Sequence, residues 1–269
     1  MRAERQNGSG SNSEVGAKRD EGMTGPLEVK TWGTGSSNYI ALHGWGGSHD
    51  TFAPMVPMIP SSAQIQAPDL PGYGKSAHPK NWQTGEVAEM VADSVNLDEP
   101  VTIIGNCTGG VIGAELAKLS SAQVKRLVMI DPFAYAPWYF SIFLKGTFGK
   151  MAYKVTFASP IGRFFTNQAL RNKRTGDSNL TASFDRVDHD AVYSFLRMMY
   201  EHEGPERYVD LDVPIDLIVG EETFSAVKKS SQILKETLRN VRIHTLPGAG
   251  HLPIEEQSEA VAKVIFGHE

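Results

Sequence analysis

The stretch that decides the fold is VTIIGNCTGGVIGAELAKL, residues 101–119. It opens on four apolar or β-branched residues, as in a strand buried on both faces, and continues with apolar residues at helical spacing. Between strand and helix stands GNCTG, which places Cys107 in a tight turn at a helix amino terminus. The glycines let neighbouring backbone pass close by, and the helix terminus favours a thiolate. The stretch predicts a reactive Cys107, with a small buried cysteine as the alternative.

On both sides of this stretch, short apolar runs alternate with helical patterns. Such alternation predicts a mostly parallel central sheet flanked by helices on both faces. The expected strands are 28–32, 39–43, 64–67, 101–104, 126–130, 215–219 and 241–245. The expected helices are 85–96, 108–119, 226–239 and 253–266.

One long segment, from about residue 133 to 208, breaks this alternation. It contains helical patterns rich in aromatic residues and methionine, and no good buried strand. An insertion of this size between two core strands predicts a helical cap over the carboxyl edge of the sheet, where α/β folds bind ligands. The expected organisation is a disordered segment at 1–26, an α/β core at 27–132 and 209–269, and the cap at 133–208.

Composition narrows the classes of partner. The 269 residues include 26 Lys and Arg against 31 Asp and Glu, a net charge of −5, which gives no reason to expect nucleic acid or an anionic membrane as partner. No apolar run approaches the roughly 18–20 residues that span a bilayer, and the polar amino terminus lacks a signal-peptide core. The single cysteine excludes an intrachain disulfide and suits a reducing compartment. The expected location is therefore cytoplasmic, with the oligomeric state left open.

Two further turns stand at ends of expected elements. HGWGG, residues 43–47, follows a strand and forms a turn with freely exposed backbone amides, which can bind a developing oxyanion. PGAGH, residues 247–251, follows the last strand, which brings His251 to the same edge as Cys107 as a candidate general base. The alternatives are a plain glycine turn for the first and a surface histidine for the second.

Taken in order, HGWGG, DLPGYGKS (residues 69–76), GNCTGG and PGAGH resemble the α/β-hydrolase superfamily, from about Leu27 onward. The resemblance implies the α/β-hydrolase fold and a triad in the order nucleophile, acid, histidine. It also implies an oxyanion hole formed by the backbone N–H groups of Trp45, in the HGWGG loop, and of Thr108, the residue after Cys107. It leaves the substrate open, because this superfamily includes esterases, thioesterases, peptidases, dehalogenases, epoxide hydrolases and acyltransferases.

The chain departs from the family pattern at two places. Cys107 stands where serine is usual, either as the native nucleophile, as in dienelactone hydrolases and polyhydroxyalkanoate synthases, or as a replacement for serine. After the strand IDLIVG the family has Gly-x-x-Asp, whereas residues 220–223 read GEET, which puts Thr223 at the aspartate position. Two carboxylates remain as candidates for the acid. Asp131, 24 residues after Cys107 at a strand end, is favoured as in some haloalkane dehalogenases, and Glu222 is the alternative.

These roles predict covalent acyl chemistry. His251 takes the proton of Cys107, which attacks an acyl carbonyl whose oxyanion is held by the two amides. Forming a thioester from an ester or thioester costs less than forming it from an amide, so the expected activity is that of an esterase or thioesterase acting on a small-molecule substrate with a hydrophobic acyl group. Acyl transfer and ligand binding without catalysis are the alternatives. No metal cluster or phosphate-cradling loop stands out, so no cofactor is expected.

Overall fold

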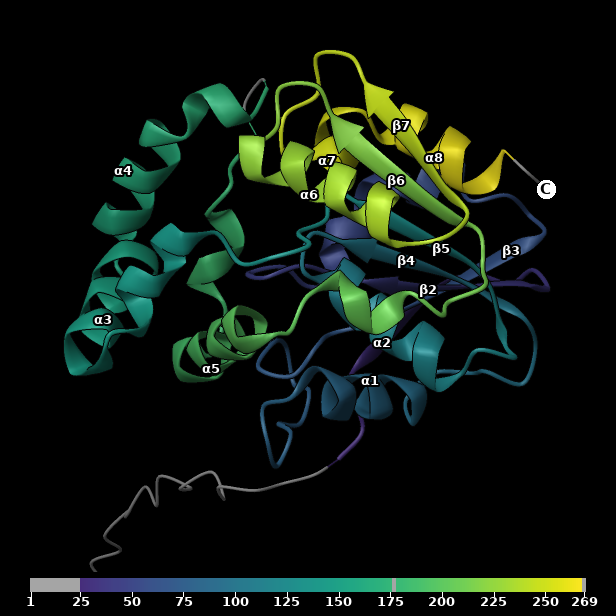
Figure 1. Cartoon of the computed structure of the whole chain (residues 1–269), viewed down its shortest axis with the longest axis horizontal. Coiled ribbons are helices and arrows are strands. Elements are labelled where there is room, and N and C mark those ends of the chain that lie inside the picture. Colours follow the sequence, from purple (N-terminus) through teal and green to yellow (C-terminus); the bar gives the residue numbers. More distant parts are fainter. Residues whose placement is uncertain (1–24, 176–177, 268–269) are drawn as a thin grey trace, which may run out of the picture.

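The computed structural model describes residues 25–175 and 178–267 (Figure 1). Of the segment predicted to be disordered, residues 1–24 lie outside the described residues. Seven strands form one sheet in the order β1-β3-β2-β4-β5-β6-β7. The strands are β1 (Val29–Gly33), β2 (Ser37–Leu42), β3 (Ala63–Pro68), β4 (Val101–Asn106), β5 (Val124–Ile130), β6 (Ile215–Gly220) and β7 (Val241–Leu246).

The sheet confirms the expected architecture. Only β1, at one edge, pairs antiparallel, with β3; all other neighbouring strands are parallel. Each strand lies within two residues of its expected bounds. The reason is that the central strands are buried on both faces, which produces continuous apolar runs that a sequence shows plainly.

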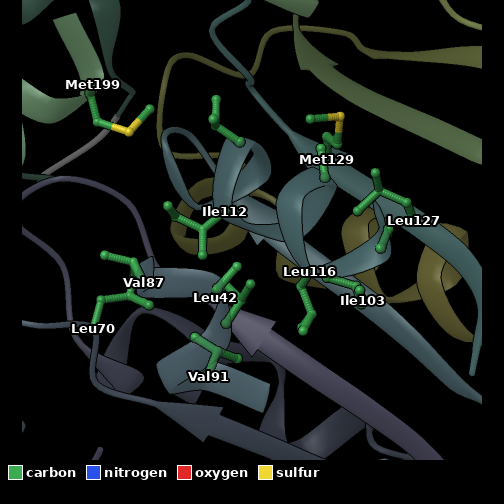
Figure 2. Packing of buried hydrophobic residues seen from close by; sticks show 14 of the residues in the cluster. Leu42, Leu70, Val87, Val91, Ile103, Ile112, Leu116, Leu127, Met129 and Met199 are labelled. Atoms are coloured by element: carbon green, nitrogen blue, oxygen red, sulfur yellow. The ribbon is translucent and has the colours of Figure 1, made fainter. Parts of the chain in front are cut away.

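Two hydrophobic clusters lie on opposite faces of the sheet. Because side chains alternate along a strand, Ile40 and Leu42 of β2 enter one cluster while Tyr39 and Ala41 enter the other. The first cluster is covered by α1 (Thr84–Ala92), α2 (Gly109–Leu119) and α6 (Ser225–Thr237). The second is covered by the 3₁₀ helix η1 (His49–Met58), α7 (Pro253–Glu256) and α8 (Ser258–Phe266). Figure 2 shows Val87, Val91, Ile112 and Leu116 of the first cluster around Leu42 and Ile103.

The carboxyl-terminal helix differs from expectation. Residues 253–266 form two helices, α7 and α8, because Gln257 leaves the helical region with φ −145° and ψ 53°. Its side-chain amide donates to the carbonyl of Pro247 at 2.7 Å, and the neighbouring Glu256 carboxylate accepts from the backbone N–H of Gly250. The break therefore ties the helix pair to the loop that carries His251.

Between β5 and β6 the described chain forms helices and no strand, as expected (Figure 1). Helices α3 and α4 lie at the outer edge of the molecule, and α5 lies between α3 and α1 in the same view. The elements are η2 (Trp138–Leu144), α3 (Gly146–Tyr153), the π-helical η3 (Lys154–Ala158), α4 (Pro160–Ala169), η4 (Arg171–Lys173), η5 (Ala182–Asp185), α5 (His189–Glu201) and η6 (Pro205–Tyr208). The division into core and cap at residues 133 and 208 stays a prediction.

Candidate active site

Two neighbouring parallel strands each end at a candidate site residue, at the same edge of the sheet. Cys107 follows β4 and Asp131 follows β5, and both adopt the left-handed conformation, with φ 52° and 46°. Non-glycine residues rarely take this conformation, which costs about 1–3 kcal/mol. The sheet ladder holds both residues there, because the Cys107 N–H donates to Ile130 O and the Asp131 N–H to Ile218 O, each at 2.8 Å. Both side chains are thereby turned out of the strand direction.

The glycines around Cys107 are required because neighbouring segments of the chain lie too close to leave room for a Cβ atom. A Cβ on Gly105 would meet the Cα of Gly110 at 2.5 Å, and one on Gly109 would collide with the carbonyl oxygen of Leu42. A Cβ on Gly44 would lie 2.8 Å from the Cβ of Cys107. The start of α2, the end of β2 and the HGWGG loop therefore meet tightly around the cysteine.

His251 is joined to the carboxylate of Asp131. Their Nδ1 and Oδ2 atoms lie 2.8 Å apart, and the Asp131 side chain is fully buried. The other Asp131 oxygen, Oδ1, accepts from the backbone N–H of Gly220 at 2.8 Å. The rings of Phe133 and Phe224 lie edge-on to the imidazole, with centroids 5.8 and 4.8 Å away. Asp131 is therefore held on both oxygens, and its partner imidazole is confined between aromatic rings.

The surroundings of His251 favour its protonated form. Burial alone lowers the pKa of His251, but hydrogen bonds with Asp131 and with the Cys107 thiol, together with their charges, outweigh burial and raise the pKa to about 10. Because Nδ1 is engaged by Asp131, Nε2 is the nitrogen that remains for the thiol. An imidazole held in this way is a strong proton acceptor for an adjacent nucleophile.

The two candidates for the acid are placed differently. Asp131 reaches His251, whereas the Glu222 side chain is exposed and its backbone N–H bonds to Ala249 O at 2.7 Å. Thr223, at the position where the family has aspartate, is buried. Its hydroxyl donates to Asp131 Oδ2 and lies 3.2 Å from His251 Nδ1. Sequence reasoning considered Thr223 only as a missing acid and overlooked it as a hydrogen-bond donor to another acid.

The HGWGG loop is fixed by a buried, neutral histidine. His43 Nε2 accepts from the backbone N–H of Leu70 at 2.9 Å, so Nδ1 carries the proton and donates to Gly44 O, also at 2.9 Å. Burial lowers the pKa of His43 to about 4. The Gly46 N–H donates to the Tyr73 hydroxyl at 2.9 Å, which connects the loop to the DLPGYGKS segment.

The expected oxyanion-hole residues are neighbours in space. The backbone N–H of Trp45 donates to the hydroxyl of Thr108 at 2.8 Å. The Trp45 amide is thus directed at the side chain of the residue that immediately follows Cys107. The Trp45 indole N–H donates to Val192 O at 3.2 Å, which links the loop to α5.

An apolar cavity of about 60 Å³ lies beside Cys107. The residues that line it include Val111 on α2, Leu196 and Met199 on α5, Phe140 on η2, and Phe133 in the loop after β5. The Trp45 ring forms part of the wall and packs against aromatic rings of the helical segment. Its centroid lies 5.7 Å from that of Phe140, 4.8 Å from that of Phe157 and 4.8 Å from that of Phe184.

The chain matches the alpha/beta hydrolase family over residues 40–264, and it belongs to that family. It is 24% identical over 229 residues to pimeloyl-[acyl-carrier protein] methyl ester esterase of Neisseria meningitidis, covering 82% of this chain and 89% of the relative. The enzyme of the same name from Aromatoleum aromaticum is 24% identical over 245 residues, covering 84% and 95%.

Solved structures share the fold at low sequence identity. The enol-lactonase of Burkholderia xenovorans LB400 has a TM-score of 0.74 and 15% identity, covering 90% of this chain and 95% of that chain. A thermophilic esterase of Thermogutta terrifontis has a TM-score of 0.71 and 20% identity, covering 90% and 92%. The α/β-hydrolase fold is therefore confirmed, and the named relatives agree with the expected class of hydrolase. Within residues 25–175 and 178–267, no helix combines the length and apolar character needed to cross a bilayer.

Proposed function

We propose that this protein is an esterase or thioesterase in which Cys107 forms a covalent acyl-enzyme. The observation that carries the proposal is the chain of contacts from Asp131 through His251 to the Cys107 thiol, at the edge of the sheet where the apolar cavity opens. Nucleophile, base and orienting acid in hydrogen-bond reach are the arrangement that nucleophilic acyl chemistry needs.

The reaction proceeds in two halves. In the first, His251 Nε2 takes the Cys107 proton, Sγ bonds to the acyl carbon, and the carbonyl bond pair moves onto its oxygen. Collapse of this tetrahedral species breaks the bond to the leaving alcohol or thiol, which receives the proton from His251. In the second half water attacks the thioester, His251 takes a proton from that water, and Cys107 leaves as the thiol with the carboxylic acid as product.

The oxyanion is held by the backbone N–H groups of Trp45 and Thr108 in this scheme. Because the Trp45 amide bonds to the Thr108 hydroxyl in the free protein, a substrate oxygen takes the place of that hydroxyl. Rotation about the Thr108 Cα–Cβ bond moves the hydroxyl aside without breaking the fold. The amide is therefore already directed at the site where negative charge develops.

The cavity favours a hydrophobic acyl group. Its walls next to Cys107 are mainly apolar, and the described residues that line it include one protonatable imidazole, His202. Burial lowers the pKa of His202, which keeps this imidazole uncharged at neutral pH. The relatives from Neisseria meningitidis and Aromatoleum aromaticum are named as esterases of pimeloyl-[acyl-carrier protein] methyl ester, which supports an ester as the substrate of this protein.

The test is turnover of acetyl, butyryl, octanoyl and dodecanoyl p-nitrophenyl esters and of the corresponding acyl thioesters. Wild type is expected to hydrolyse them with a preference for apolar chains, and Cys107→Ala to lose roughly 10⁴-fold or more in kcat. Product that forms mainly with an added alcohol or thiol, rather than with water, identifies an acyltransferase instead. Binding of acyl compounds that Cys107→Ala leaves unchanged, with no turnover in wild type, identifies a non-catalytic protein.

A further inference from the structure

Helix α4 directs its apolar side chains to solvent. Ile161, Phe164 and Phe165 are 70%, 66% and 65% exposed, and their spacing of three and four residues places them on one face. No residue of α4 is buried. A surface helix of a globular protein normally turns its apolar stripe inward, so α4 has the reverse arrangement.

The preceding helices repeat this arrangement. Phe148 and Met151 of α3 and Val155 of η3 are 71%, 57% and 62% exposed, at positions that follow each other at three and four residues. On η2, Trp138 and Ile142 are 81% and 50% exposed and lie four residues apart. Four successive elements, from η2 to α4, therefore leave apolar side chains uncovered.

These stripes belong to closely packed elements. A Cβ on Gly149 of α3 would meet the backbone of Ile142 and Phe143, and one on Gly162 of α4 would meet the backbone of Val155 and Thr156. Of the eleven large apolar residues that are exposed in the described parts of the chain, nine lie here. We call them the apolar face: Trp138, Tyr139, Ile142, Phe148, Met151, Val155, Ile161, Phe164 and Phe165.

The same segment is basic, although the protein is acidic. Between Asp131 and Asp177 the sequence has no Asp or Glu and seven basic residues. Because the whole chain carries −5, the remainder carries −12. The basic residues are Lys145, Lys150, Lys154, Arg163, Arg171, Lys173 and Arg174.

Two of these basic residues form ion pairs with a neighbouring element. Lys150 and Lys154 pair with Asp190 of α5 at 2.9 and 3.4 Å. Lys145 and Arg171, at opposite ends of the segment, are exposed. A second copy of the chain is a poor occupant for this face, since dimerisation through it brings two basic segments together.

We propose that the apolar face docks on the surface of an anionic lipid bilayer. Helices that carry Trp, Phe and Ile on one side and Lys or Arg beside them lie in the interface plane, with apolar side chains in the headgroup and acyl boundary. Basic residues near the surface are attracted to anionic headgroups. The net charge of the whole chain gives no indication of this basic segment, because the acidic residues lie outside it.

The docked face adjoins the cavity. Phe140 lines the cavity beside Cys107, while its chain neighbours Trp138, Tyr139 and Ile142 belong to the apolar face. In Figure 1 α3 and α4 stand at the outer edge, away from the sheet. An acyl chain that leaves the bilayer here reaches the cavity through η2. This route rests on the proposed function, whereas docking itself does not.

The test is co-sedimentation of full-length Cys107→Ala protein with vesicles, so that no turnover is involved. Binding to phosphatidylcholine vesicles containing phosphatidylglycerol is expected to exceed binding to phosphatidylcholine alone by at least about tenfold. The double variant Phe164→Ser/Phe165→Ser is expected to bind at least about tenfold more weakly. The matched control is Leu119→Ser, because Leu119 is 50% exposed on α2, outside the apolar face, and this variant is expected to bind as the parent does.

A second readout locates the contact. Trp138 is the exposed tryptophan, so brominated lipids are expected to quench its fluorescence, and Trp138→Phe to remove most of the quenching. Circular dichroism verifies that each variant is folded. Absence of vesicle binding, binding that the Phe164→Ser/Phe165→Ser variant retains, or self-association that this variant abolishes would each overturn the proposal.

Discussion

The hydroxyl of Thr223 donates a hydrogen bond to Asp131, on the same carboxylate oxygen that binds His251. Asp131 lies at the end of β5 and Thr223 in the loop after β6, so residues that follow two neighbouring strands meet at one carboxylate. Thr223 occupies the position where the family has its aspartate, and it contributes a hydrogen-bond donor instead of a carboxylate. Thr223 acts in the proposed mechanism as a positioning residue for Asp131.

Replacing Thr223 with valine keeps the shape and removes the donor. We expect kcat for ester hydrolysis to fall about tenfold with KM little changed, because a hydrogen bond to a charged group contributes about 1.5–3 kcal/mol. Thr223→Ser restores the hydroxyl and is expected to retain most of kcat. Equal loss in both variants would show that packing, rather than the hydrogen bond, is what Thr223 supplies.

The acid can be moved to its usual family position. Asp131→Asn is expected to lose most activity, since Asn holds His251 in the wrong tautomer. Adding Thr223→Asp to this variant places a carboxylate where the hydroxyl now lies 3.2 Å from His251 Nδ1. The double variant is expected to recover at least about tenfold in kcat over Asp131→Asn, as measured by p-nitrophenyl butyrate hydrolysis. Activity close to that of wild type in folded Asp131→Asn would contradict the role of Asp131 as the acid.

Acid stability is expected to depend on His43. Its pKa is lowered to about 4 by burial, while an unfolded chain has a histidine pKa near 6.5. Between these values the unfolded state binds the extra proton, so stability contributed by neutral His43 is present above about pH 6.5 and is lost as pH falls toward 4. Urea unfolding across this range is expected to show a flatter pH dependence in His43→Gln than in wild type. Identical slopes would contradict this assignment.

Phe184 is expected to anchor the HGWGG loop. It is 3% exposed, and a Cβ on Gly46 would collide with its ring, so the two are in tight contact. Phe184→Ala opens a cavity and is expected to cost about 3–5 kcal/mol of unfolding free energy. Phe164→Ala, at an exposed phenylalanine of α4, is the matched control and is expected to change stability by less than about 0.5 kcal/mol. Thermal and urea denaturation measure both, and similar losses would contradict the packing argument.

The sequence predicts those features that depend on local pattern. Continuous apolar runs marked the strands, and GNCTG between strand and helix marked the turn of Cys107, because both signals lie within a few residues. Contacts between segments that are distant in the chain cannot be predicted from such local patterns. The break at Gln257 depends on its bond to Pro247, and the role of Thr223 depends on where Asp131 lies in the folded sheet.

The distribution of charge is a second feature that the overall composition does not predict. The net charge of −5 is a sum over the whole chain, so it does not show that residues 132–176 are basic, and only the structure shows that apolar side chains of the same segment are exposed. A helical pattern of apolar residues normally packs against the rest of a protein. The structure instead leaves Phe148, Phe164 and Phe165 in solvent, which no sequence pattern distinguishes from burial.

The most direct measurement of the central claim is intact-protein mass spectrometry during reaction with p-nitrophenyl butyrate, comparing wild type, Cys107→Ala and Cys107→Ser. The account predicts a butyryl adduct on Cys107 that forms and then decays in wild type, no adduct in Cys107→Ala, and an ester-linked adduct on the substituted side chain in Cys107→Ser. Turnover by wild type without any adduct at this position, or equal turnover by Cys107→Ala, contradicts it.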